Sequence, residues 1–188
     1  MDTHLKSYLI TDPKYYSNNE ELFKKNLKKV LTNKKVDIAC FRDKESSNFE
    51  ELAKIFIEVC NEFNIKKILL NSDYLLAKKL GATGVHLTST QFDKIKEAKN
   101  LDLYVIISCH NFNEIEKAQN SYANAVTYSP IFHTPNKGEP KGINSLKQAI
   151  HLYDDMNIIA LGGILTNEQL TQIQKAKAYG FASIRYFI

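Results

Sequence analysis

One segment decides the fold: residues 36–70, VDIACFRDKESSNFEELAKIFIEVCNEFNIKKILL, which combine two strand patterns with one helix pattern. Residues 36–41 and 67–70 are short apolar runs, as is typical of buried strands. Between them, Phe49, Leu52, Phe56, Cys60 and Phe63 recur at the spacing of one face of an α-helix. A strand, a helix and a strand in succession predict two parallel strands joined by a right-handed crossover.

The same alternation continues in both directions along the chain. Further strands are predicted at residues 7–11, 84–87, 103–108, 125–128, 158–161 and 181–184. Further helices are predicted at residues 18–31, 73–80, 91–99, 113–120 and 167–176, and in a segment that follows Gly142 and ends near Tyr153. Eight strands alternating with seven helices favour a small (β/α)8 TIM barrel, a single domain over residues 1–188 with the eighth helix missing or truncated. A doubly wound open sheet is the alternative.

Composition and charge argue against several classes of protein. The 188 residues are 44% hydrophobic and 24% charged, which is typical of one globular domain. No apolar run approaches the roughly 20 residues that span a bilayer, and the N-terminus lacks the apolar core of a signal peptide, so we expect a cytoplasmic protein with no membrane partner. The net charge of +4 is spread along the chain, which argues against nucleic-acid binding. Three widely separated cysteines form no CxxC pair and suggest no metal site.

In both architectures, ligands bind at the carboxyl ends of the strands. The residues predicted there are rich in cations, hydroxyls and glycines, which suit a phosphorylated small molecule. The predicted substrate-binding residues are Arg42, Lys44, Asn71, Ser108, Thr134, Asn136, Lys137, Gly162, Gly163, Ile184 and Arg185. Arg42 and Lys44 could instead be surface charges, and the long loop at residues 129–142 could be either a binding loop or a plain surface loop. His110 and His133 lie where a proton-transfer group is needed, whereas His86, inside a strand, is more typical of a hydrogen-bonded core residue.

Several short motifs follow one another in a familiar order: YLITD at residues 8–12, FRDK at 41–44, LGATGVHL at 80–87, SCH at 108–110, SPIFHTPNK at 129–137, ALGGI at 160–164 and GF at 180–181. Through them the chain resembles the thiamine phosphate synthase/TenI superfamily of small (β/α)8 barrels over nearly its whole length. The synthase joins a pyrimidine diphosphate to a thiazole phosphate and releases pyrophosphate. The resemblance implies that Arg42, Lys44, Asn71 and Lys137 match its pyrophosphate and pyrimidine ligands. It also implies that Ser108 and Thr134 match further pocket positions and that Gly163 matches the thiazole-phosphate turn.

The chain departs from the synthase pattern at its acidic positions. Ser72 stands where the pattern has an Asp after Asn71, and Gln91 stands where it has a second metal-binding Asp. Arg185 replaces a small Ser beside the thiazole phosphate, where it could add a phosphate contact or fill the site. We therefore expect no bound metal, and Mg²⁺ only if the chain is a synthase.

The function expected from this resemblance is that of a TenI-like enzyme. It would bind a thiazole phosphate and isomerise it, as a thiazole tautomerase does. Pro130 occupies the position of the catalytic His of that pattern, so His133 or His110 would act as the acid and base. Two alternatives stay open: a thiamine phosphate synthase, which would also bind pyrophosphate, and a non-catalytic barrel that binds a phosphate ligand. Without an eighth helix, Tyr186, Phe187 and Ile188 would leave an apolar face uncovered, which predicts a possible homodimer.

Overall fold

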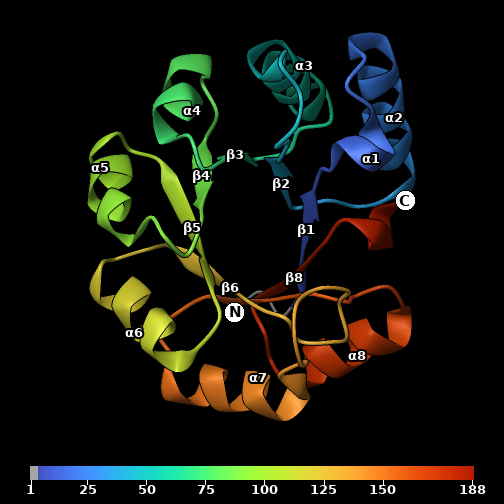
Figure 1. Cartoon of the computed structure of the whole chain (residues 1–188). Coiled ribbons are helices and arrows are strands. Elements are labelled where there is room, and N and C mark those ends of the chain that lie inside the picture. The colour runs from blue at the N-terminus through green and yellow to red at the C-terminus, as the bar shows by residue number, and fades with distance from the viewer. Residues whose placement is uncertain (1–3) are drawn as a thin grey trace.

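The computed structural model describes residues 4–188 and forms a closed barrel of eight parallel strands (Figure 1). Each strand pairs with the next one along the chain, and β1 pairs with β8 to close the cylinder. The strands are β1 (Lys6–Ile10), β2 (Ile38–Phe41), β3 (Lys67–Asn71), β4 (Gly84–Leu87), β5 (Tyr104–Cys109), β6 (Ala125–Tyr128), β7 (Ile158–Leu161) and β8 (Gly180–Ser183). The structure therefore confirms the predicted (β/α)8 barrel, and the open sheet is wrong.

The interior of the barrel is a packed core, because alternate side chains of every strand point inward. Tyr8, Ile38, Leu69, Ile106 and Ile159 belong to one buried cluster inside the cylinder. The side chains of opposite parity form a second, larger cluster between the strands and the helices. Since the apolar layers fill the barrel, the polar side chains that follow the strands are left to form its C-terminal mouth.

The helices form a ring around the strands (Figure 1). They are α1 (Pro13–Tyr16), α2 (Glu20–Asn33), α3 (Phe49–Glu62), α4 (Tyr74–Leu80), α5 (Ile95–Asn100), α6 (Phe112–Asn120), α7 (Gly142–Leu152) and α8 (Asn167–Lys175). None of the helices within residues 4–188 is long and apolar enough to cross a bilayer.

Two helical segments differ from the sequence prediction. The short helix α1 was not expected, and it forms because Pro13 occupies its first turn while the Asp12 carboxylate accepts a hydrogen bond from the Lys14 amide. The helix predicted at residues 91–99 is divided into a 3-10 turn, η1 (Phe92–Lys94), followed by α5.

Strand β8 is followed by a single 3-10 turn, η2 (Arg185–Phe187), so the helix expected after the eighth strand is truncated, as predicted. Figure 1 shows this turn in the helical ring between α2 and α8. Phe187 is buried and stacks on Phe181, with ring centroids 5.9 Å apart, and the hydroxyl of the half-buried Tyr186 donates a hydrogen bond to Asn167 on α8. The turn thus covers much of the apolar face expected to be open, although Ile188 is 58% exposed, and dimerisation through it stays a prediction.

Candidate active site

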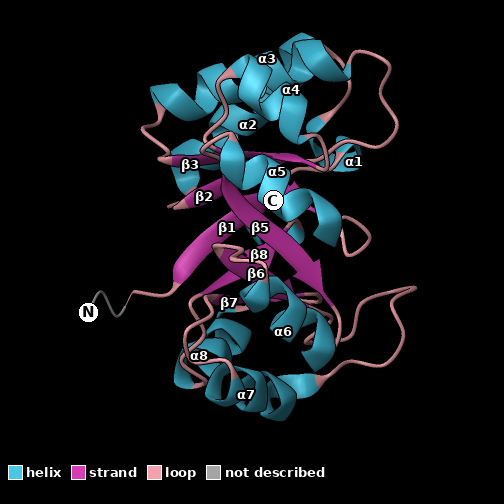
Figure 2. Cartoon of the chain, turned by 90° about the vertical axis from the view of Figure 1, so that its left-hand side faces the viewer, coloured by secondary structure: helices cyan, strands magenta, loops and turns pink. Residues whose placement is uncertain are grey.

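The C-terminal end of the barrel holds a cavity of about 800 Å³ that residues from the ends of all eight strands line. Figure 2 shows the loop between β6 and α7 projecting beyond the strands. Of the predicted site residues, all but His133 line the cavity: Arg42, Lys44, Asn71, Ser108, His110, Thr134, Asn136, Lys137, Gly162, Gly163, Ile184 and Arg185. The topology therefore brings together residues that are up to 143 positions apart in sequence, from 42 to 185.

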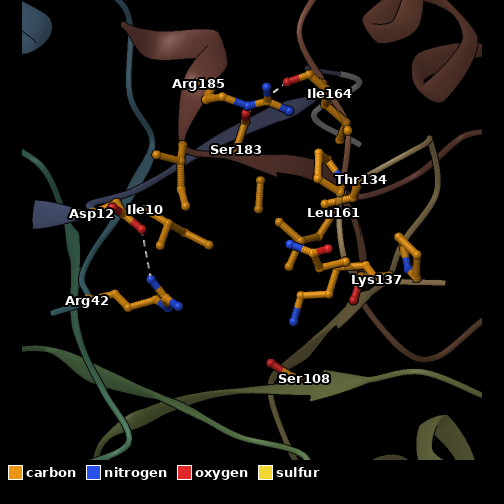
Figure 3. Close-up of a pocket in the computed structure, with 18 of the residues that line it drawn as sticks. Ile10, Asp12, Arg42, Ser108, Thr134, Lys137, Leu161, Ile164, Ser183 and Arg185 are labelled. Atoms are coloured by element: carbon orange, nitrogen blue, oxygen red, sulfur yellow. Dashed lines mark hydrogen bonds and ion pairs between the residues drawn. The ribbon is translucent and has the colours of Figure 1, made fainter. Parts of the chain in front are cut away.

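The cavity carries far more positive than negative charge. Lys14, Arg42, Lys44, Lys137 and Arg185 line it, and they come from four separate segments of the chain, since Arg42 and Lys44 share the loop after β2. Figure 3 shows Arg42 and Lys137 reaching in from opposite sides, with Arg185 on a third side next to Ser183. An enclosure with this excess of cations attracts anions and gains most from ligands with several anionic groups.

Arg42 is held in place by the ends of β1 and β2. Its Nη1 lies 3.2 Å from the Asp12 carboxylate, and its backbone amide donates to the Thr11 hydroxyl at 2.9 Å. Thr11 is buried and returns a hydrogen bond to the Arg42 carbonyl at 3.2 Å. These contacts orient the guanidinium toward the cavity while its other nitrogens stay available to a ligand.

The β6–α7 loop is fixed against the turn after β7. The amides of Ile131 and Phe132 donate to the carbonyls of Leu161 and Gly162, at 2.9 and 3.0 Å. Gly162 has a φ of +100°, and a Cβ there would lie 2.7 Å from the Pro130 Cα, so both the conformation and the contact require glycine. The Gly163 carbonyl accepts from the Gln169 side chain at 2.9 Å. Both glycine carbonyls already accept hydrogen bonds. Since an anion needs donors, the backbone amides of this turn are the groups that it can offer to one.

The floor of the cavity contains His86, which the sequence led us to expect in the core. Its Nδ1 lies 2.8 Å from the Tyr8 hydroxyl, and its Nε2 lies 3.1 Å from Ser108 Oγ and 3.4 Å from Thr127 Oγ1. Burial, together with the nearby Arg42 charge, lowers the pKa of His86 to about 4, so the imidazole is neutral at physiological pH. Sequence reasoning missed its place on the cavity because its partners come from three other strands.

The two histidines proposed for proton transfer lie in different places. His110 lines the cavity, and its Nδ1 is 3.2 Å from Ser129 Oγ and 3.3 Å from the Ser129 carbonyl. With Nδ1 engaged, Nε2 is the ring nitrogen that can meet a ligand. His133 is exposed and is not among the residues that line the cavity.

The carboxylates near the mouth do not fit a magnesium cage. Among residues 4–188, Asp12 is the one acidic side chain that lines the cavity, and it is paired with Arg42. Asp43 turns back on its own loop, where hydrogen bonds from Ser46 and Glu45 outweigh its burial and lower its pKa, and Asp73 caps α4 by accepting from the Leu76 amide. Gln91 holds the two neighbouring loops together, since it donates to the Ser72 carbonyl and accepts from the Thr88 amide, each at 3.0 Å. In the described part of the chain, no three His, Cys, Asp or Glu side chains gather to hold a metal.

The chain is thus a small (β/α)8 barrel with a cationic mouth at the carboxyl ends of its strands. The family model described as thiamine monophosphate synthase, TMP-TENI, matches residues 7–187. The thiamine-phosphate synthase of Pelagibacter ubique is 33% identical over 175 residues, which cover 90% of this chain and 83% of that protein. The thiamine-phosphate synthase of Lactococcus lactis subsp. lactis is 30% identical over 165 residues, which cover 82% and 75%. The chain therefore belongs to the thiamine monophosphate synthase/TenI family.

Solved structures agree on the fold. The thiamine phosphate pyrophosphorylase from Pyrococcus furiosus superposes with a TM-score of 0.80 at 20% identity, covering 96% of this chain and 85% of that one. The aldolase QR15 superposes with a TM-score of 0.67 at 12% identity, covering 98% and 91%. At these identities the likeness concerns the fold alone, and the aldolase illustrates that one barrel can carry different chemistry.

Proposed function

We propose that this chain is a transferase of the thiamine phosphate synthase type, which joins a pyrimidine diphosphate to a thiazole phosphate. The observation that carries the proposal is the cavity of about 800 Å³, in which cations from separate strand ends surround one space with a single acidic side chain among the described residues. A cavity of this size can hold two heterocycles and three phosphate groups at once. The relatives named thiamine-phosphate synthase support this function better than the tautomerase that the sequence analysis favoured.

The proposed reaction is a substitution at carbon. The thiazole nitrogen attacks the methylene carbon of the pyrimidine, a C–N bond forms, and the C–O bond to the diphosphate breaks with its electron pair leaving on pyrophosphate. Negative charge therefore grows on the leaving group, and Arg42, Lys44 and Lys137, which line the cavity, would stabilise it. Because this step moves no proton to or from carbon, it does not need His133, which lies outside the cavity lining.

The family implies Mg²⁺ for the synthase, but the carboxylates of this cavity do not form its usual oxygen cage. We therefore assign the charge neutralisation of the pyrophosphate to Arg42, Lys44 and Lys137.

The test is to incubate the protein with both substrates, with and without Mg²⁺, and to measure thiamine phosphate and pyrophosphate by chromatography with mass detection. We expect the two products in equal amounts. Arg42→Gln should lower the rate at least about 100-fold, because it removes a positively charged hydrogen-bond donor to the leaving group. Lys147→Gln, on the exposed surface of α7, is the matched control. Tight binding of both substrates without product in either condition would contradict the proposal and indicate a binding protein instead.

One observation favours the tautomerase as a second candidate. His110 lines the cavity with Nδ1 anchored to Ser129, so its Nε2 could move a proton on a thiazole carboxylate phosphate. Conversion of that compound between its tautomers by the protein would establish this activity. An unchanged rate in both His110→Asn and His133→Asn would show that neither histidine moves the proton.

A further inference from the structure

Three side chains from three strands form a continuous hydrogen-bonded chain that ends at the cavity. It runs from the Tyr8 hydroxyl on β1 to Nδ1 of His86 on β4, and from Nε2 of His86 to Ser108 Oγ on β5. Tyr8 is fully buried and His86 is 4% exposed, whereas Ser108 is half-buried and lines the cavity. The reaction proposed above gives His86 and Tyr8 no role, so this buried polar chain calls for a physical reason.

The direction of the hydrogen bonds follows from the chemistry of the three groups. A neutral imidazole has one donor and one acceptor nitrogen. If Tyr8 accepted a hydrogen from Nδ1, its own hydroxyl hydrogen would be left with the sulfur of Cys40, a weak acceptor. The phenol is also a stronger acid than the hydroxyl of Ser108, so Tyr8 donates to Nδ1. The proton of His86 is then on Nε2.

The Nε2 proton faces Ser108 Oγ at 3.1 Å, with Thr127 Oγ1 as a second, longer contact at 3.4 Å. Ser108 therefore accepts from His86, and its own hydrogen stays free to donate into the cavity. In the reverse arrangement, Ser108 would spend its hydrogen on His86 and present only lone pairs to a ligand. Besides burial, the positive charge of Arg42 acts on His86 and further disfavours a protonated imidazole.

We propose that His86 is a positioning residue which, with Tyr8, fixes the Ser108 hydroxyl as a hydrogen-bond donor to a ring nitrogen of the bound pyrimidine. The proposal rests on the function proposed above for the choice of ring. The thiazole nitrogen must keep its lone pair free for attack, so a donor fixed in the floor suits the pyrimidine and would inhibit the reaction if it met the thiazole nitrogen. The network thus discriminates between two heterocycles that both carry an acceptor nitrogen.

The direction of the chain is tested by the ¹⁵N NMR signals of the histidine side chains, with His86 assigned by their loss in His86→Gln. We expect a neutral ring protonated on Nε2 and unchanged between pH 5.5 and 9. A ring protonated on Nδ1, or one that titrates within that range, would overturn the proposal. This measurement uses no ligand and is independent of the reaction that the protein catalyses.

The contribution to binding is tested by calorimetric titration with pyrimidine diphosphate and, separately, with inorganic pyrophosphate. Tyr8→Phe and Ser108→Ala should raise the Kd for pyrimidine diphosphate about 10-fold, because one neutral hydrogen bond to the ring is lost. The Kd for pyrophosphate should change by no more than about twofold. Tyr128→Phe is the matched control, since its hydroxyl contacts Ser145 on α7, outside the barrel. If the affinity for both ligands falls equally, or for neither, His86 has a purely structural role and the proposal fails. An Nε2-protonated ring in a protein that does not bind pyrimidine diphosphate would support the direction of the chain and contradict the proposed function.

Discussion

At the scale of single residues, a neutral imidazole in the middle of the barrel makes the stability of the protein depend on pH. The pKa of His86 is about 4 in the folded protein and near 6.5 in an unfolded chain, so between these values the unfolded state binds more protons. The stability that neutral His86 contributes is complete above about pH 6.5. It is lost as the pH falls toward about 4, by up to about 3 kcal/mol in the free energy of unfolding. The lowered pKa values of Asp37 and Asp43 act in a separate window, below about pH 4.

The free energy of unfolding in urea at pH 7.5 and pH 4.5 measures this effect. We expect the free energy of unfolding of the wild-type protein to fall by most of this amount, about 3 kcal/mol, between pH 7.5 and pH 4.5. The fall should be much smaller in His86→Gln. Glutamine can still donate to Ser108 but does not titrate. An equal loss in both proteins would show that His86 is not held neutral by the fold.

Arg185 is the second residue whose role is open to a direct test. It is exposed, lines the same cavity as Gly162 and Gly163, and is the first residue of η2. A guanidinium in this place can form charge-assisted hydrogen bonds to a phosphate, so Arg185→Ser should raise the Kd for thiazole phosphate about 10-fold or more. The exposed Lys147→Ser on α7 controls for the loss of one positive charge. Tighter binding by Arg185→Ser would mean that the side chain fills the site.

At the scale of elements, the turn after β7 decides where the β6–α7 loop lies. A Cβ on Gly163 would lie 2.4 Å from the His133 carbonyl oxygen, and its φ is +66°. Gly163→Ala should therefore lower both stability and pyrophosphate affinity, because the loop that carries Lys137 must move. Gly138→Ala is the matched control: its φ is +70°, but no atom lies within 4 Å of the added Cβ. It carries the conformational cost of about 1 kcal/mol without the collision.

Thermal unfolding and pyrophosphate titration of the two variants separate these contributions. We expect Gly163→Ala to lose at least about 1 kcal/mol more stability than Gly138→Ala, with a clear loss of affinity in the first alone. Equal effects would mean that the contact between the two loops does not position Lys137.

The alternation of strands and helices was predictable from sequence because each element is defined by local periodicity. β4, β6 and β7 have the predicted bounds, and Thr166 caps α8 as its sequence pattern suggests. Most residues of the candidate site could be predicted for the same reason, since parallel strands place their carboxyl ends at one mouth of the barrel. Arg42, Lys137 and Arg185 could be placed there without any knowledge of side-chain contacts.

What could not be predicted depends on contacts between distant segments or on the direction of one side chain. Tyr8 and His86 are 78 positions apart, and no pattern within either strand indicates that they meet. His133 is close in sequence to Thr134, which lines the cavity, yet the course of the loop leaves His133 itself exposed. Asp43 and Asp73 both follow strand ends near the mouth, but each carboxylate is used locally, by a loop turn and by a helix N-terminus.

Over the molecule as one body, the barrel brings cations from distant parts of the chain to one mouth, with Arg42 on one side of the cavity and Arg185 on another (Figure 3). Two anionic ligands should therefore bind together and not in competition. Arg42 and Arg185 are 143 positions apart in the sequence (42 to 185), so they share one mouth only in the closed cylinder.

Calorimetric titration of inorganic pyrophosphate into protein saturated with thiazole phosphate measures whether the two anions bind to the cavity together. We expect one pyrophosphate to bind per chain with or without the thiazole phosphate, and Arg42→Gln to abolish pyrophosphate binding while thiazole phosphate still binds. Displacement of one ligand by the other would show a single anion site and contradict a cavity built to bring two phosphorylated substrates together.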